Sequence, residues 1–224
     1  MVTYSSETNS STLFLPHALE YRNNAIEMER IIDMRSDTVT LPTKEMKQTM
    51  LTAPLGDDVF GEDPTVNALQ KKVATLLGKE DALFVPSGTM ANLICVLGHC
   101  WSRGAEVILG DQTHIFLFEQ GGIAQLGGVH PRPLPNLPDG TFSIELMENV
   151  FRNNNIHFPV TSLVCIENTH NLIGGKALPL KWVDEVGRKC KELGSFTCRR
   201  CPTFQRISSL ECSSRKIGER RLFC

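Results

Sequence analysis

A Ser-Gly-Thr triplet, Ser87-Gly88-Thr89, stands where a short apolar run gives way to the start of a helical pattern. At such a junction the free backbone N–H groups and the positive end of the helix dipole converge, which favours an anion. The glycine lets the chain approach a ligand closely, and the two hydroxyls can complete a phosphate-binding loop. The same residues also suit ordinary capping of a helix N-terminus, and the sequence leaves both interpretations open.

Three further polar segments could belong to the same site. Residues 35–38 adjoin the start of the folded region, residues 111–114 follow one expected strand, and residues 167–171 follow the most apolar one. The carboxyl ends of strands in an open α/β sheet face the ligand crevice, so these segments and Ser87 could meet there. The alternative is separate capping and turn chemistry for each segment.

Two histidines, His114 and His157, could move a proton near neutral pH or lay a flat ring against an aromatic cofactor. Each could equally be a satisfied structural residue. Cys198 and Cys201 have the spacing of half a zinc site, but no second pair with suitable spacing follows, so no metal is expected. Neither a P-loop nor a Gly-x-Gly-x-x-Gly fingerprint is present, which weakens the case for nucleotide binding.

The elements that must position these residues alternate along the chain from Pro42 onward. Helices are expected after Thr43, over 64–77, over 90–100, after Thr113, over 143–151 and over 180–193. Strands are expected over 82–86, 106–109, 129–134 and 161–166. Parallel strands need crossover connections, which helices of this length provide. The predicted class is therefore α/β, a three-layer fold with a mainly parallel sheet and helices on both faces.

The composition is that of an ordinary globular protein, since 41% of the 224 residues are hydrophobic and 21% are charged. A net charge of -2 gives no reason to expect a nucleic-acid partner. No apolar stretch approaches the roughly 20 residues needed to cross a bilayer, so a membrane partner is not expected either. We expect a cytoplasmic protein in which Cys95, Cys100 and Cys165 are small core residues.

Three segments differ in composition. Residues 1–30 are polar and are expected to be a flexible leader, whereas residues 31–194 carry the alternating pattern. Residues 195–224 hold seven Lys or Arg against two Glu and show no strand or helix period, so we expect an aberrant or disordered tail.

Four motifs in order resemble those of the threonine aldolase family. They lie at residues 32–40, 56–65, 86–92 and 167–171, and the resemblance runs from about residue 31 to residue 194. The family belongs to the beta-eliminating lyases, pyridoxal-phosphate enzymes of the aspartate-aminotransferase-like fold type I. The resemblance implies that residues 31–194 are a partial version of the large domain of that fold.

The activity implied by the resemblance is retro-aldol cleavage of a small β-hydroxy amino acid, L-threonine or L-allo-threonine, to glycine and acetaldehyde. The family correspondence assigns Ser87-Gly88-Thr89 to the phosphate of pyridoxal 5′-phosphate and His114 to stacking on its ring. It assigns Ser36 to the substrate carboxylate and His157 to a place near the substrate. Phe60 stands where the family usually has Tyr. Family active sites lie between subunits, which implies a homo-oligomer.

The resemblance stops after Gly194. The family continues to an Asp-Gly-Ala-Arg segment, whose Asp partners the pyridine nitrogen, and to a Ser-Lys-Gly segment with the Schiff-base lysine. Neither occurs in this sequence, and the surroundings of Lys176 and Lys216 do not match. We therefore expect this chain to be inactive by itself, and hypothesise that its tail reflects alternative splicing, a frameshift or a gene-model error. The alternatives are a noncatalytic binding or subunit-pairing module, or an α/β domain without this ligand.

Overall fold

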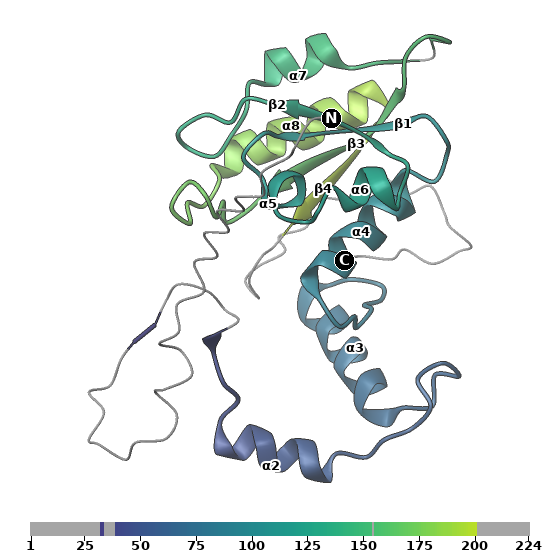
Figure 1. Ribbon diagram of the computed structural model, residues 1–224, viewed down its shortest axis with the longest axis vertical. Helices are drawn as coiled ribbons and strands as arrows, with labels where there is room; N and C mark the ends of the chain where they lie inside the picture. The colour runs from purple at the N-terminus through teal and green to yellow at the C-terminus, as the bar shows by residue number, and fades with distance from the viewer. Residues whose placement is uncertain (1–31, 34–38, 154, 201–224) are drawn as a thin grey trace, which may run out of the picture. The chain divides into compact units, whose positions relative to one another are not determined.

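The computed structural model describes residues 32–33, 39–153 and 155–200 (Figure 1). The chain divides into two units, Met1–Ala53 and Pro54–Cys224. In the first unit α2 spans Lys44–Thr52, and the Thr43 hydroxyl accepts a hydrogen bond from the Met46 N–H. This confirms the helix expected after Thr43. The leader predicted at residues 1–30 and the candidate residue Ser36 lie outside the described residues.

The second unit is built on a four-stranded sheet in which every pair of neighbours is parallel. Its strands are β1 (Ala105–Gly110), β2 (His130–Leu134), β3 (Val160–Glu167) and β4 (Phe196–Arg200), in the order β2-β1-β3-β4. All four strands therefore end on the same side, which we call the carboxyl end of the sheet, and begin at its amino end. The parallel sheet confirms the α/β class.

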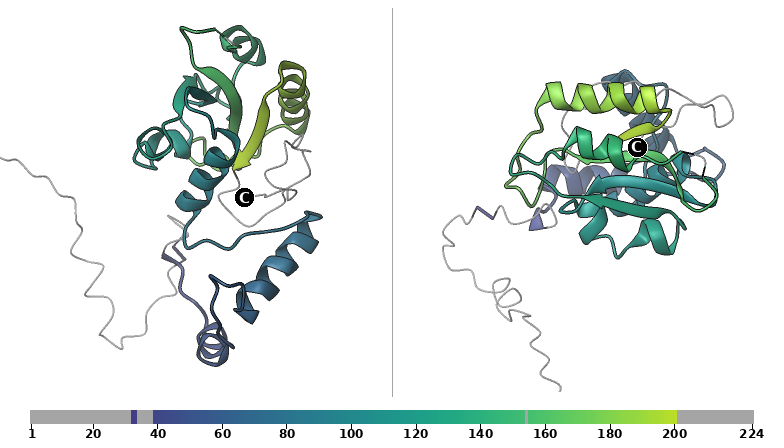
Figure 2. Two further views of the ribbon diagram at one scale, coloured as in Figure 1. Left: turned by 90° about the vertical axis from the view of Figure 1, so that its right-hand side faces the viewer. Right: turned by 90° about the horizontal axis from the view of Figure 1, so that it is seen from above.

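Helices cover both faces of the sheet (Figures 1 and 2). Val107 and Leu109 of β1 share one apolar cluster with residues of α4 (Gly88–His99), α5 (His114–Leu117) and α6 (Gly122–Gln125). On the other face Ile108 packs with residues of α7 (Ile144–Val150) and α8 (Leu180–Leu193). Successive strand residues point to opposite faces, so a sheet covered on both sides needs continuously apolar strands. The arrangement confirms three layers.

Cysteines take part in both clusters. Cys95, Cys100 and Cys165 are buried and form no disulfide, which confirms that they serve as small core residues. Cys190 is equally buried on α8, although the sequence groups it with the cysteines near the chain end. Within the described residues, no helix is both long and apolar enough to cross a membrane.

The helix α3 spans Pro64–Leu77 and begins and ends as its sequence predicts. One Asp63 oxygen accepts hydrogen bonds from the N–H groups of Thr65 and Val66, each at 2.9 Å. Pro64 occupies the first turn, where no intrahelical N–H is needed. Gly78 ends the helix at a φ of 62°, in the left-handed region that glycine tolerates best.

The strand expected over residues 82–86 does not form. The Phe84 N–H donates to the Gln70 side-chain oxygen at 2.9 Å, and no other described strand lies alongside this segment. Leu83 and Phe84 remain about half exposed. An apolar run becomes a strand only where a neighbouring strand accepts its hydrogen bonds, and this requirement is invisible in a local pattern.

A strand does form where none was expected. β4 pairs with β3 from Leu163 opposite Phe196 to Glu167 opposite Arg200. Gly194 ends α8 in the left-handed conformation, and the Ser195 N–H donates to the Cys190 carbonyl at 2.9 Å. The turn directs the chain along the edge of β3, which pairs with a strand that is not continuously apolar. The predicted absence of a strand after Gly194 is therefore wrong, and residues 201–224 lie outside the described part.

Candidate active site

The Ser-Gly-Thr triplet opens α4. The Ser87 hydroxyl accepts a hydrogen bond from the Met90 N–H at 3.2 Å, which makes Ser87 the N-cap of this helix. All three residues are exposed, and no atom lies within 4 Å of the place a Cβ on Gly88 would take. The capping interpretation is thus confirmed. The phosphate interpretation stays a prediction. The N-terminus of α4 is accessible, as binding of a phosphate would require.

His114 follows β1 at the carboxyl end of the sheet and is held through both its backbone and its ring. Its backbone N–H donates to the Glu167 carboxylate at 2.6 Å. Its ring Nδ1 lies 2.9 Å from Oε1 of Glu119. Both glutamates are buried, whereas the His114 side chain is 28% exposed. The ring is therefore fixed in orientation and still accessible to a ligand.

Asn92 joins the triplet to this histidine. Its side-chain amide donates to the same Glu119 oxygen at 2.7 Å. Asn92 lies three residues after Thr89 and four after Gly88, so the three share one face of α4. The hydrogen bonds through Glu119 thus connect the second turn of α4 to His114. That the triplet and His114 bind one ligand stays a prediction.

The segment after β3 belongs to the same site. One Glu167 oxygen holds the His114 N–H, and the other accepts the Asn171 N–H at 2.9 Å. Glu167 therefore connects the loops that follow β1 and β3. Asp111 instead accepts a hydrogen bond from the Asn136 N–H at 2.8 Å. This agrees with the alternative interpretation of its segment, which was turn chemistry.

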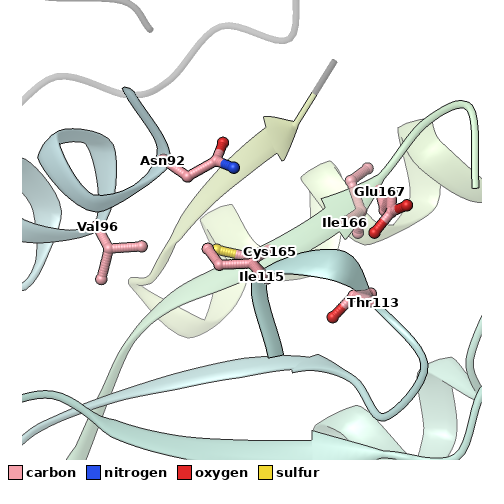
Figure 3. A pocket seen from close by; sticks show the side chains of 7 residues that line it. All are labelled: Asn92, Val96, Thr113, Ile115, Cys165, Ile166 and Glu167. Atoms are coloured by element: carbon pink, nitrogen blue, oxygen red, sulfur yellow. The ribbon is translucent and has the colours of Figure 1, made fainter. Parts of the chain in front are cut away.

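A small hollow opens between α4, the start of α5 and the end of β3 (Figure 3). Asn92, Thr113 and Glu167 provide its polar side chains. The remaining lining is apolar and consists of Val96, Ile115, Cys165 and Ile166. At about 10 Å³ the hollow has room for roughly one water molecule, so it is not by itself a pocket for a cofactor.

His157 is not brought to this site. It lies exposed in the turn before β3, where its N–H donates to the Asn155 side chain at 2.9 Å. β1 and β3 are parallel, so His157 is at the amino end of the sheet, whereas His114 is at the carboxyl end. One chain therefore does not place the two histidines on the same ligand. Ser36 lies outside the residues that the structure describes.

The amino end of the sheet holds a second cluster, centred on Glu106. This side chain is fully buried, and its Oε1 accepts the Thr161 hydroxyl at 2.9 Å. Three basic groups surround Oε2: Arg132 Nε at 2.9 Å, Arg152 Nη1 at 3.5 Å and His130 Nε2 at 3.8 Å. The Arg152 guanidinium also lies 4.6 Å from the ring centre of Phe158, the neighbour of His157.

Sequence reasoning missed Glu106, Glu119 and Asn92. The signal for Glu106 is an acidic residue inside the apolar strand 105–110, because a buried carboxylate needs partners. Glu119 follows His114 by five residues, and its partner Asn92 is 27 residues earlier. No local spacing announces such a contact. No group of three or more His, Cys, Asp or Glu among the described residues could hold a metal ion.

The family model of the beta-eliminating lyases matches residues 33–198. The chain belongs to the beta-eliminating lyase family. Members of this family depend on pyridoxal 5′-phosphate. The match extends four residues past Gly194 and includes the start of β4.

The relatives of this chain include threonine aldolases. It is 52% identical over 167 residues to a probable low-specificity L-threonine aldolase 2 of Arabidopsis thaliana, covering 74% of this chain and 47% of the relative. It is 48% identical over 162 residues to the low specificity L-threonine aldolase of Escherichia coli, covering 72% and 47%. The chain thus spans about half the length of the curated relatives it matches.

Solved structures agree with the fold of the family. The Leishmania major threonine aldolase superposes with a TM-score of 0.58 at 25% identity, covering 69% of this chain and 44% of that one. A putative L-allo-threonine aldolase of Listeria monocytogenes gives 0.53 at 27% identity, covering 65% and 38%. The predicted resemblance to threonine aldolases and the predicted fold are both confirmed.

Proposed function

We propose that this chain supplies one part of the active site of a pyridoxal-phosphate-dependent threonine aldolase. The reaction is the retro-aldol cleavage of L-threonine or L-allo-threonine to glycine and acetaldehyde, part of threonine catabolism and glycine formation. The observation that carries the proposal is the Asn92–Glu119–His114 chain of hydrogen bonds, which joins an exposed helix N-terminus to a partly exposed imidazole. We also propose a cytoplasmic location, in line with four buried cysteines that form no disulfide.

The residues present fit the phosphate and the ring of the cofactor. Ser87-Gly88-Thr89 offers hydroxyls and helix N-terminal amides at an exposed position, where a phosphate would be bound. His114 offers a fixed flat ring at the same site. When bound, the cofactor supplies an electron sink for the pair released from the broken Cα–Cβ bond.

This chain's own residues would bind and orient the ligands. Glu167 holds the loop that carries His114, and the buried residues Val96, Ile115 and Cys165 form the apolar core behind that loop. A group that takes the β-hydroxyl proton is also needed, and the family correspondence assigns His157 to the substrate. Because His157 lies at the opposite end of the sheet, we propose that it serves the site of a second subunit.

A homo-oligomer follows from that arrangement. The same observation favours a second candidate function, in which the chain pairs with an intact aldolase subunit without turning over substrate itself. The Asp-Gly-Ala-Arg and Ser-Lys-Gly segments of the family do not occur in these 224 residues. We therefore expect the chain alone to bind the cofactor without a covalent bond and to release no acetaldehyde from L-threonine.

The proposal is tested by titrating the full chain with pyridoxal 5′-phosphate and following its absorbance. We expect the double variant Ser87→Ala, Thr89→Ala to bind about a hundredfold more weakly or worse, because two hydrogen bonds to a charged group are lost. Ser143 caps α7 by the same hydrogen bond, to the Leu146 N–H at 3.1 Å. Ser143→Ala is thus the matched control and should leave binding unchanged.

Equal binding by the double variant and the parent would overturn the phosphate assignment. Borohydride reduction followed by peptide mapping tests whether the cofactor is bound without a covalent bond. We expect no lysine to be labelled stoichiometrically. Acetaldehyde release by the chain alone, at a rate comparable with that of an intact aldolase, would contradict the expectation that turnover needs the family's Asp-Gly-Ala-Arg and Ser-Lys-Gly segments.

A further inference from the structure

Glu119 is a buried carboxylate in the candidate site. None of the four sequence motifs includes it. It is 7% exposed, and a single oxygen, Oε1, receives both the Asn92 amide at 2.7 Å and the His114 Nδ1 at 2.9 Å. The two contacts come from α4 and from the start of α5. Glu119 therefore connects Asn92, near the start of α4, to the ring of His114 through one oxygen atom.

The chemistry of these contacts determines where the His114 proton lies. An ionised carboxylate only accepts hydrogen bonds, so the Nδ1 facing it must carry a hydrogen. The Asn92 side-chain amide also donates a hydrogen bond to Oε1 of Glu119, so this oxygen acts as an acceptor. In the neutral ring the second nitrogen, Nε2, is then left with a lone pair.

The orientation of the ring is fixed from three directions. The backbone N–H of His114 is bound by Glu167 at 2.6 Å, so the main chain cannot shift freely. The ring Nδ1 is bound by Glu119, which opposes rotation of the imidazole. Phe118 lies beside the ring with its centre 5.5 Å away and an interplanar angle of 51°. A flat ligand would meet a ring that is already oriented.

We propose that Glu119 is a positioning residue, which holds His114 as the Nδ1–H tautomer with its ring plane set for a flat cofactor ring. The inference about the ligand rests on the proposed function, whereas the tautomer is a property of this chain alone. Glu119 acts through His114 and touches neither cofactor nor substrate in this account.

The ring nitrogens can be read directly in the full chain. Long-range ¹H–¹⁵N correlation spectra distinguish the two tautomers, and a His114→Gln variant identifies its signals among those of the six histidines. We expect the parent to show the Nδ1–H form and Glu119→Ala to move toward the Nε2–H form. Glu119→Gln should restore the parent pattern, because its carbonyl oxygen still accepts. Asn92→Ala, which leaves the His114 contact in place, is the matched control.

An Nε2–H tautomer in the parent would overturn the proposal, and this measurement needs no variant to fold. So would a Glu119→Ala spectrum identical to that of the parent. A merely structural role predicts loss of stability without a change of tautomer, and it predicts the same loss in Glu119→Gln.

A second measurement separates this inference from the proposed function. We expect Glu119→Ala to weaken binding of pyridoxal 5′-phosphate about tenfold and to leave binding of inorganic phosphate unchanged. If the parent binds no pyridoxal 5′-phosphate but shows the expected tautomers, the proposed function fails and the positioning role stands. If the parent binds it and Glu119→Ala binds it equally well, the positioning role fails and the proposed function stands.

Discussion

The two ends of the parallel sheet each bury glutamate, but they surround it differently. At the amino end Glu106 lies among Arg132, Arg152 and His130. At the carboxyl end Glu119 receives an amide and an imidazole nitrogen, and Glu167 receives two backbone N–H groups. The same residue type therefore compensates side-chain charge at one end and fixes the positions of loops at the other.

This difference predicts different consequences of removal. Loss of Glu106 would leave buried or half-buried guanidinium groups without a counter-charge, which chiefly lowers stability. Loss of a glutamate at the carboxyl end frees donors that lie near a partly exposed ring, so geometry should change more than stability. This contrast would be wrong if mutations at the two ends changed stability and local geometry to the same extent.

The largest effect is expected for Glu106→Ala at the amino end. Because Arg132 and Arg152 lose their shared partner, the free energy of unfolding should fall by about 3–5 kcal/mol. Urea denaturation of the full chain measures it. Glu185→Ala is the control, since Glu185 pairs with Arg188 on the exposed face of α8 and should change little. A stability within about 1 kcal/mol of the parent would contradict a charge-compensating role for Glu106.

A smaller loss is expected for Glu167→Gln at the carboxyl end. An amide has one carbonyl oxygen, so one of the N–H groups of His114 and Asn171 would face an NH₂ group. We expect a loss of roughly 1–3 kcal/mol and faster hydrogen exchange at one of those two amides. Slow exchange at both would show that Glu167 does not hold the two loops together. The same variant should leave exchange near Glu106 unchanged.

The smallest effect is expected at the start of α3, away from the buried clusters at either end. Asp63→Ala removes an N-cap, which should lower Tm by about 2–4 °C. The N–H groups of Val66, Gly56 and Thr65 hold the pKa of Asp63 below its usual value of 3.8. Its contribution is therefore fully present above that value and is lost as the pH falls through the lower, folded-state pKa.

The measurement is the Tm difference between parent and Asp63→Ala, taken at neutral pH and again at about pH 2. The difference should shrink in acid. A difference that stays constant over this range would contradict stabilisation by the ionised carboxylate, and would leave a purely steric role for the side chain.

Local chemistry accounts for what the sequence could predict of the fold. Asp63, Pro64 and Gly78 define α3 because capping and left-handed backbone depend only on nearby residues. The run 82–86 and β4 were mispredicted because strand formation depends on a neighbour that can be far away in sequence. Pairing with β3 was sufficient to make Phe196–Arg200 a strand, although this segment ends in two arginines.

The site shows the same division. His114 and Ser87 were predictable because each stands at the junction where a strand ends or a helix begins. Glu119 and Asn92 were not, because their contact forms only when α4 and α5 pack together. The position of His157 depends on strand direction, which the sequence predicts, yet its separation from His114 emerges only when both are placed on one sheet.

The central claim is that the Ser-Gly-Thr triplet and His114 bind one ligand, the triplet through its phosphate and His114 through its ring. Amide and imidazole NMR spectra of the full chain, titrated in parallel with pyridoxal 5′-phosphate and with pyridoxal, test it most directly. We expect the phosphate ester to shift the signals of Gly88, Thr89 and the His114 ring together, and pyridoxal to shift the His114 ring alone. Shifts confined to other residues, or identical shifts from both ligands at the triplet, would contradict it.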